Sequence, residues 1–183
     1  MKYLRISLII AMTMSIGLSE ASAQRKKKDK YSPEKAQATK ADFIEMDPGL
    51  KSFFSSAYGY AIYPSIGKGA IGIGGAAGKG LVYRNDQIQG GSKMTQITVG
   101  FQFGGQAYSE VIFFEDADAY DRFINNEFQF AAQASAVALK SGISADAKYT
   151  EGVAVFTMAK GGLMYEASVG GQKFKFVPKN KLR

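Results

Sequence analysis

AYGYAIYPSIGKGAIGIGGAAGKGLVY, residues 57–83, decides the fold of this chain because it is dense in glycine. Residues 67–80 hold seven glycines in fourteen positions, and Gly67, Gly69 and Gly72 match the GxGxxG pattern of dinucleotide-binding turns. That pattern binds a dinucleotide only where it opens a helix. Here the next glycines alternate with Ile71 and Ile73, which predicts a strand of a tightly bent sheet instead.

Outward from this stretch, apolar and polar residues alternate with the period of two that is typical of strands. The clearest alternation places Ile97, Val99, Phe101 and Phe103 together and predicts that their face of the sheet is buried. About nine strands are expected, over residues 60–66, 70–76, 81–84, 96–103, 108–114, 128–138, 152–158, 163–169 and 174–177.

Three helices are expected beside these strands. Residues 32–34, Ser-Pro-Glu, form a helix start, and this helix should run to about Met46. A second, short helix follows Asp47, and residues 116–126 form a third. The fold class is therefore α+β: a strongly curved or barrel-like antiparallel sheet of about nine strands, with two N-terminal helices and one inserted helix.

The N-terminal segment resembles an export signal. Lys2 and Arg5 precede the apolar stretch Ile6–Leu18, and residues 21–23, Ala-Ser-Ala, form a small-residue cleavage pattern. We expect a signal peptide over residues 1–23, cleavage after Ala23, and a mature protein that is periplasmic or secreted. A basic disordered segment over 24–33, one domain over 34–178 and a basic tail over 179–183 should follow.

Composition excludes several classes of protein. The chain has 23 basic and 16 acidic residues but no His and no Cys, which excludes a Ser-His-Asp triad, a Cys nucleophile and a Cys/His zinc site. Residues 34–178 hold 13 basic and 14 acidic residues, so the positive excess lies in the two tails. A nucleic-acid-binding domain would carry its charge on the folded body, so no nucleic-acid partner is expected.

The densest acidic cluster surrounds the third expected helix and consists of Glu115, Asp116, Asp118, Asp121 and Glu127. Asp116, Asp118 and Glu127 occupy positions 1, 3 and 12 of a calcium-binding loop, but position 6 is Asp121 where that loop requires Gly. Acids at the positive end of a helix dipole explain the same residues. No spacing singles out a carboxylate pair for glycoside hydrolysis. We therefore expect no catalytic residues, no metal and no cofactor.

Three stretches resemble the SYLF family, a lipid-binding domain that is also described as an actin-binding domain in yeast proteins. They are residues 57–83, VGFQFGGQAYSEVIFFED at 99–116 and AKGGLMYEASVGGQ at 159–172, within a resemblance that covers about residues 40–177. The residues that carry it are Ala57, Gly59, Ala61, Ile62, Pro64, Gly69, Gly72, Gly74, Gly78, Gly80, Lys160, Gly161, Leu163 and Gly170. The family's Trp-containing loop and Gly-Pro turn are replaced here by residues 85–94 and 136–147.

The resemblance implies peripheral binding to anionic lipid, since eukaryotic members bind phosphoinositides through a basic N-terminal segment and some bind actin. We expect a non-catalytic periplasmic protein that binds anionic phospholipid at a membrane surface. The residues expected to bind lipid are Arg25, Lys26, Lys27, Lys28 and Lys30 by attraction, Lys51, Phe53 and Phe54 by insertion or docking, and Lys68 and Lys79 beside the glycine-rich hairpin. The alternative is a structural or interaction module of the cell envelope that binds a protein or glycan partner.

Overall fold

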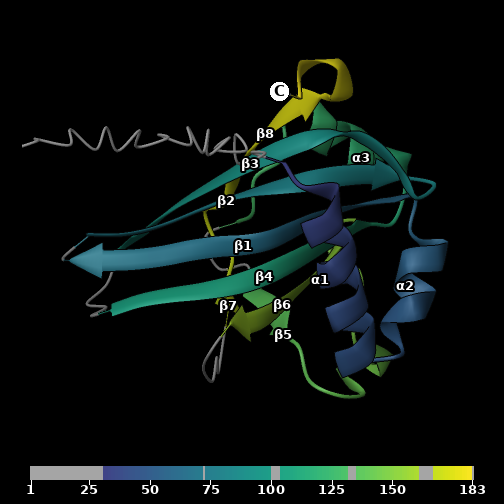
Figure 1. The fold of residues 1–183 in the computed structure, drawn as a ribbon, viewed down its shortest axis with the longest axis horizontal. Helices are drawn as coiled ribbons and strands as arrows, with labels where there is room; N and C mark the ends of the chain where they lie inside the picture. Colours follow the sequence, from purple (N-terminus) through teal and green to yellow (C-terminus); the bar gives the residue numbers. More distant parts are fainter. Residues whose placement is uncertain (1–30, 72, 100–103, 132–134, 161–166, 183) are drawn as a thin grey trace, which may run out of the picture.

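A computed structural model describes residues 31–182 apart from 72, 100–103, 132–134 and 161–166 (Figure 1). The helices are α1 (Pro33–Met46), α2 (Leu50–Ser56) and α3 (Ala117–Ile124), with short 3-10 turns at Ile143–Ala145 and Lys179–Lys181. The strands are β1 (Gly59–Ile71), β2 (Ile73–Arg84), β3 (Gln87–Val99), β4 (Gly104–Phe114), β5 (Ser135–Ala138), β6 (Val153–Lys160), β7 (Ala167–Ser168) and β8 (Lys173–Pro178).

The starts of α1 and α3 follow from local sequence. Ser32 caps α1, because its Oγ accepts a hydrogen bond from the Lys35 backbone N–H at 3.3 Å, and Pro33 occupies the first helical position. Asp116 caps α3 in the same way, accepting from the Ala119 N–H at 2.9 Å. The prediction of three helices is confirmed at all three positions.

The strands form a mixed sheet in the order β7-β5-β6-β4-β1-β2-β3-β8, in which β5 and β6 are parallel and the other pairs are antiparallel. The α+β class is therefore confirmed. The expected antiparallel sheet is wrong at the parallel pair β5–β6. In the described part of the chain the edge strands β7 and β8 do not pair with each other, so the expected strongly curved or barrel-like shape is not confirmed. The expected nine strands are not confirmed either: eight are described, because the three expected strands 60–66, 70–76 and 81–84 form the two strands β1 and β2.

The glycine-rich stretch forms the hairpin β1–β2, which confirms the prediction that it is strand and does not open a helix. Gly67 pairs with Ala77 and Gly69 pairs with Gly75 across this hairpin. Gly78 is required for close packing, because a Cβ there would lie 2.6 Å from Ile66 Cγ1.

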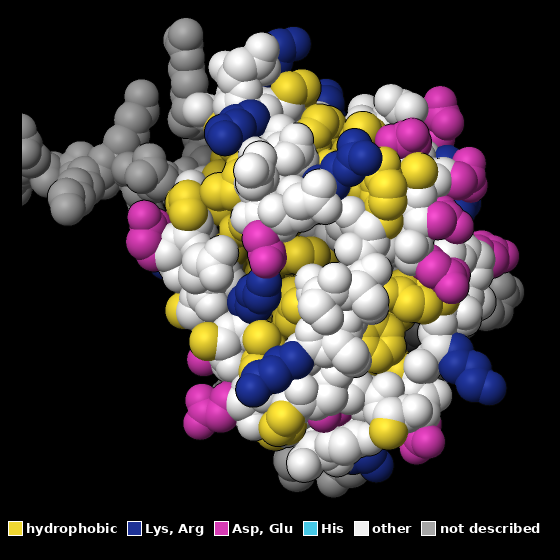
Figure 2. Space-filling view, turned by 90° about the vertical axis from the view of Figure 1, so that its right-hand side faces the viewer, with side chains coloured by type: hydrophobic (Ala, Val, Ile, Leu, Met, Phe, Trp, Pro, Cys, Tyr) yellow, Lys and Arg dark blue, Asp and Glu magenta, His cyan; other side chains and the backbone are white. Residues whose placement is uncertain are grey.

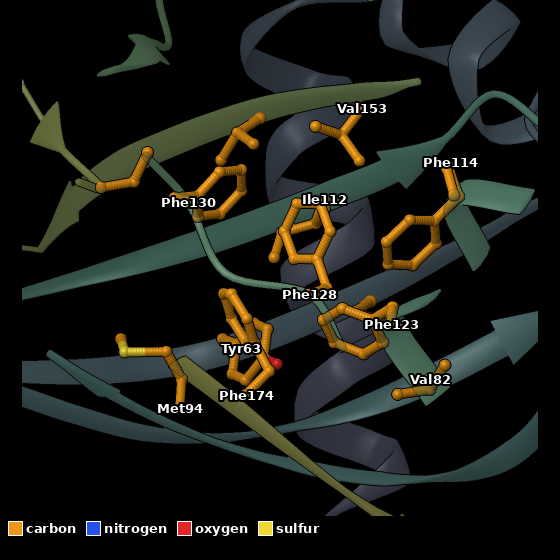
Figure 3. Packing of buried hydrophobic residues seen from close by; sticks show 14 of the residues in the cluster. Tyr63, Val82, Met94, Ile112, Phe114, Phe123, Phe128, Phe130, Val153 and Phe174 are labelled. Atoms are coloured by element: carbon orange, nitrogen blue, oxygen red, sulfur yellow. The ribbon is translucent and has the colours of Figure 1, made fainter. Parts of the chain in front are cut away.

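Each face of the sheet carries its own hydrophobic core. The α1 face is covered by α1 and α2, and its core includes Ile62, Leu81 and Phe113. The opposite face, here the α3 face, carries α3 and a core of interlocking aromatic rings around Phe123 and Phe174 (Figure 3). A sheet with both faces covered keeps its strands in one fixed register, because a slip by one residue would exchange the two cores.

The predicted burial of the Ile97 face is wrong. Ile97 is 76% exposed, whereas its neighbour Gln96 is 4% exposed and faces the α3 side. Gln96 is held there by a hydrogen bond from its Nε2 to the Gly170 carbonyl at 2.9 Å. Of the other residues of that prediction, Phe101 and Phe103 lie outside the described residues, and the side chain of Val99 is not described.

Candidate functional site

A row of three lysines crosses one edge of the sheet. Lys79 on β2 is in register with Lys93 on β3, and Lys93 is in register with Lys175 on β8. All three side chains are exposed. They lie on the α1 face, because Leu81, two residues beyond Lys79 on β2, packs in the core of that face. We call Lys79, Lys93 and Lys175 the lysine row.

No carboxylate accompanies this row on its own strands, because β2, β3 and β8 contain neither Asp nor Glu. Within the described ranges the ion pairs are Lys40–Asp86 and Arg122–Asp118, so neither includes the row. Like charges directly opposite each other destabilise a sheet, by about 0.2–1 kcal/mol for each pair. An anion bound over the row would relieve that repulsion.

A pocket of about 370 Å³ opens beside Lys79. Residues 77–81 of β2 form its floor, and its walls are the start of α1 and residues 64–65 of β1. Lys35 and Lys79 both line this space, and its lining includes no acidic residue. The row and the pocket together form a positively charged area on the α1 face.

Pro64 produces one wall of the pocket. Proline cannot donate a ladder hydrogen bond, and inside a sheet it is found at bulges. Between the pairs Ile62–Leu81 and Ile66–Gly78, β1 has three residues where β2 has two, so residues 63–65 form a bulge with one extra residue. The Ser109 hydroxyl donates to the Pro64 carbonyl at 2.9 Å and holds the bulge in place.

The predicted basic run, Arg25, Lys26, Lys27, Lys28 and Lys30, lies outside the described residues. The described chain starts at Tyr31, which lines the pocket. The Tyr31 ring also covers Gly91 of β3, where a Cβ would lie 2.5 Å from Tyr31 Cε1. Tyr31, the first described residue, therefore lies next to the lysine row.

Lys51, Phe53 and Phe54 all lie on α2. Lys51 is exposed, while Phe53 packs against Phe113, Tyr149 and Phe156 with ring centroids 5.3–5.6 Å apart. Phe54 is 7% exposed and packs edge-on against Phe113 at 4.8 Å. Both rings therefore pack on the core of the α1 face, and their role in lipid binding stays a prediction. Insertion of Phe54 would require α2 to leave the sheet.

Lys68 and Lys79 do not lie together. Lys68 is in register with Ala76, which is buried in the core of the α3 face, so the two lysines are on opposite faces of the hairpin. The bulge at residues 63–65 determines this arrangement, because it shifts which residues of β1 face each side.

Lys35, Lys93 and Lys175 are site residues that the sequence reasoning missed. One signal was present: the alternation in Lys173-Phe174-Lys175 places both lysines on the same face of a strand. Nothing in the sequence shows that β8 pairs with β3, which lies far from it along the chain.

Glu110 on β4 is a fully buried carboxyl group. Its Oε2 accepts a hydrogen bond from Gln172 Nε2 at 3.0 Å, and the same amide donates to the Tyr108 hydroxyl at 3.2 Å. Burial raises the pKa of Glu110 to about 7, although the Gln172 hydrogen bond opposes this shift. A substrate cannot reach this carboxyl in the described conformation, because its side chain has no exposed surface.

The acidic cluster around α3 has structural roles. Asp116 is the helix cap, and Asp118 forms an ion pair with Arg122 at 3.2 Å, one turn further along. Among the described residues, no three side chains of metal-ligating type come together. The helices in the same ranges are too short or too polar to cross a bilayer.

Residues 95–179 match the model of a family described as Ysc84, Las17-binding protein actin regulator. The chain is also 30% identical, over 128 residues, to Beta cell expansion factor A of Aeromonas veronii. That alignment covers 69% of this chain and 49% of the relative, so the chain spans about half the length of that protein.

Proposed function

Because residues 95–179 of this chain belong to the Ysc84 (SYLF) family, we propose that the protein binds anionic phospholipid at a membrane surface and catalyses no reaction. The family is one of binding modules for lipid or actin. In this proposal the signal peptide over residues 1–23 is removed after Ala23, and the mature protein acts in the periplasm. The lysine row and the basic run make the contact with lipid.

The observation that carries the proposal is the lysine row on strands without acids. A Lys near an anionic surface contributes about 1 kcal/mol, so the three lysines contribute about 3 kcal/mol in all. That amount corresponds to an affinity change of about 100-fold. The three charges lie side by side on one face of the sheet, so all of them can approach the same layer of headgroups.

The position of Tyr31 supports a membrane contact on the side of the molecule that carries the lysine row. Tyr31 and Lys79 both line the pocket between α1 and β2, and the basic run immediately precedes Tyr31 in the sequence. Two groups of positive charge on one side of the molecule attract a surface together, whereas groups on opposite sides would compete. Asp118 and Asp121 are exposed on α3, which packs on the opposite face of the sheet. Acidic side chains gather at the upper right of the space-filling view (Figure 2).

Vesicle co-sedimentation at two salt concentrations tests this proposal. We expect the purified protein to bind phosphatidylglycerol-containing vesicles and to leave pure phosphatidylcholine vesicles unbound, with weaker binding at high salt. Replacing Lys79, Lys93 and Lys175 by Gln should weaken binding by about 100-fold. Deleting residues 24–30 should weaken it further.

A matched control replaces Lys140, Lys148 and Lys160 by Gln, three exposed lysines that lie outside the row, so it removes the same charge. This variant should retain most of the binding. Equal losses in the two triple variants would mean that net charge alone drives adsorption. Binding that is absent or insensitive to salt would favour the alternative, a module that binds a protein or glycan of the cell envelope.

Fractionation of the source cells tests the location. The protein should appear in the periplasmic fraction, and mass spectrometry of its N-terminus should find Gln24 as the first residue. Recovery from the cytoplasm with residues 1–23 intact would contradict the proposed location.

A further inference from the structure

Glu110 is bonded, across the α3 face of the sheet, to the turn that precedes β8. In the order of strands, β1, β2 and β3 separate β4 from β8. Gln172 lies in the turn of residues 169–172 and nevertheless reaches Glu110, since its Nε2 donates to Glu110 Oε2 at 3.0 Å. Val169 and Gln172 are both buried, so the turn forms a cover over the carboxyl. We call residues 169–172 the cover turn.

The Glu110 carboxyl matches its surroundings when it holds a proton. Glu110 Oε1, Thr157 Oγ1 and Gln172 Oε1 are buried and have no hydrogen-bond partner among the described residues. The amide nitrogen of Gln172 already donates to Glu110 Oε2 and to the Tyr108 hydroxyl. A protonated Oε1 can donate to the Thr157 or the Gln172 oxygen, whereas an ionised carboxylate only accepts. Ionisation therefore sets acceptor against acceptor where the carboxyl meets the cover turn.

The elements packed around Glu110 supply no counter-charge within the described ranges. Tyr63 on β1 is in register with it, and Tyr108 is two residues away on β4. Burial raises the pKa of both phenols, so both stay neutral. Lys68 is on the α3 face of β1, but it is in register with a residue four positions from Glu110, about 13 Å along the strand. β6 and the cover turn contribute neutral Thr157 and the amide described above. An ionised Glu110 therefore favours any opening that admits water.

The cover turn is the part of this enclosure that can open most easily. β4 pairs with β1 and β6 along most of its length. The cover turn is tied to the neighbouring chain by two longer bonds, from the Gly171 N–H to the Phe130 carbonyl at 3.2 Å and from the Phe130 N–H to the Gln172 carbonyl at 3.3 Å. β8 follows directly, and this edge strand carries Lys175 of the lysine row. Movement of the turn therefore releases the start of β8.

We infer that Glu110 is a proton-controlled latch: the protonated carboxyl holds the cover turn closed and Lys175 in the lysine row, and loss of the proton loosens both. This inference rests on the proposed membrane attachment and adds its regulation, because binding should weaken as the pH rises. Burial raises the pKa of Glu110 to about 7. The chain has no His, the side chain that ordinarily titrates near neutral pH, so the latch replaces the usual sensor.

Hydrogen exchange of the purified protein tests the latch without lipid. Each measured rate is divided by the intrinsic rate of the same amide at the same pH. An exposed carboxyl is ionised throughout the range from about pH 6 to about pH 8, whereas the enclosed one loses its proton near the middle of it. Opening at the Gly171 and Gln172 amides should therefore increase about tenfold over this range, while the amides of β1 and β2 in the same sample stay constant.

Two variants assign this response to its source. Glu110→Gln has no proton to lose, so exchange in its cover turn should not change over the same range. Glu127→Gln, at an exposed position, should behave like the wild-type protein. The α-amino group also titrates in this range, but it is the same in all three proteins.

Binding to phosphatidylglycerol vesicles tests the link to the membrane, because the charge of this phosphodiester is constant over the range. The wild-type protein should bind up to about fivefold more weakly at the higher pH, which is the contribution of one lysine. Glu110→Gln should bind equally at both pH values. Lys175→Gln should lose the pH response, whereas Lys79→Gln should bind more weakly and retain it.

Other outcomes overturn the inference in distinguishable ways. Exchange in the cover turn that does not change with pH, or that rises equally in Glu110→Gln, would show that Glu110 is not a latch. A pH-dependent turn with pH-independent vesicle binding would break the link to the lysine row. No vesicle binding at either pH would remove the proposed function and this link together, while the exchange rates still decide the latch. If Glu110→Gln does not fold, the comparison of the cover turn with β1 and β2 in the wild-type protein decides it.

Discussion

Replacing Glu110 by Gln should make the protein more stable at neutral pH and above. Glu110 is fully buried, and its Oε1 has no hydrogen-bond partner among the described residues. The fold therefore favours the protonated carboxyl, whose pKa is raised to about 7 from an ordinary value of 4.5. Gln preserves the shape of the side chain and removes the charge.

The sign and size of the effect follow from this shift. Below pH 4.5 the carboxyl is protonated in both the folded and the unfolded chain, so it costs no stability. As the pH rises from about 4.5 to about 7, the unfolded chain releases the proton while the folded chain retains it, so the free energy of unfolding falls. At 1.36 kcal/mol for each pKa unit, the total loss is about 3 kcal/mol.

Urea denaturation of the wild-type and Glu110→Gln proteins at several pH values between 4.5 and 8 measures the effect. The curves should coincide at the acidic end and separate with rising pH, with the variant more stable by up to about 3 kcal/mol. The added amide N–H groups have candidate acceptors, because Thr157 Oγ1 and Gln172 Oε1 are unpartnered within the described ranges.

Glu127→Gln, at an exposed position, is the matched control and should follow the wild-type curve. Parallel curves for the wild-type and Glu110→Gln proteins would refute the reasoning. A variant that is less stable than wild type at pH 8 would also refute it, because it would mean that the ionised carboxylate makes contacts that favour folding.

Three further substitutions test the packing. Phe54→Ala should lower the free energy of unfolding by about 3–5 kcal/mol in urea titrations, because it empties a site in the α1-face core; unchanged stability would mean that α2 is not docked. Gly78→Ala should cost about 1–3 kcal/mol, as its Cβ meets Ile66, while Gly67→Ala, with open space around it, should shift the melting temperature little. Asp116→Ala should cost about 1 kcal/mol through loss of the α3 cap, measured by thermal unfolding, and no change would exclude the capping role.

The elements could largely be predicted from the sequence because their signals are local. Ser32 and Pro33 mark the start of α1, Asp116 marks the start of α3, and the alternation in residues 108–114 matches most of β4. Glycine was harder to interpret: the Gly67–Gly69 region was expected to separate two strands, yet it lies within β1. Glycine weakens a strand without ending it when both neighbours supply complete ladders.

The buried face and the site depended on pairings between distant residues. Alternation alone predicted that Ile97 is buried, but the hydrogen bond of Gln96 to Gly170, 74 residues away, turns the polar side inward. The lysine row likewise exists only because β3 pairs with both β2 and β8. Lys79 was recognised beside the hairpin, whereas Lys93 and Lys175 become its neighbours only in the folded sheet.

The extra residue at the Pro64 bulge shifts the alternation of inward and outward side chains along β1 by one position. Every position after it has the opposite inward or outward parity from the one that simple counting would assign. Removing Ser65 would give a regular alternation in which Ile66 and Lys68 keep the faces that they occupy now, because the bulge and the extra residue are lost together. The bulge therefore absorbs one residue of chain length without exchanging surface and interior in the part of β1 that follows it, so a one-residue deletion at this point is compatible with both.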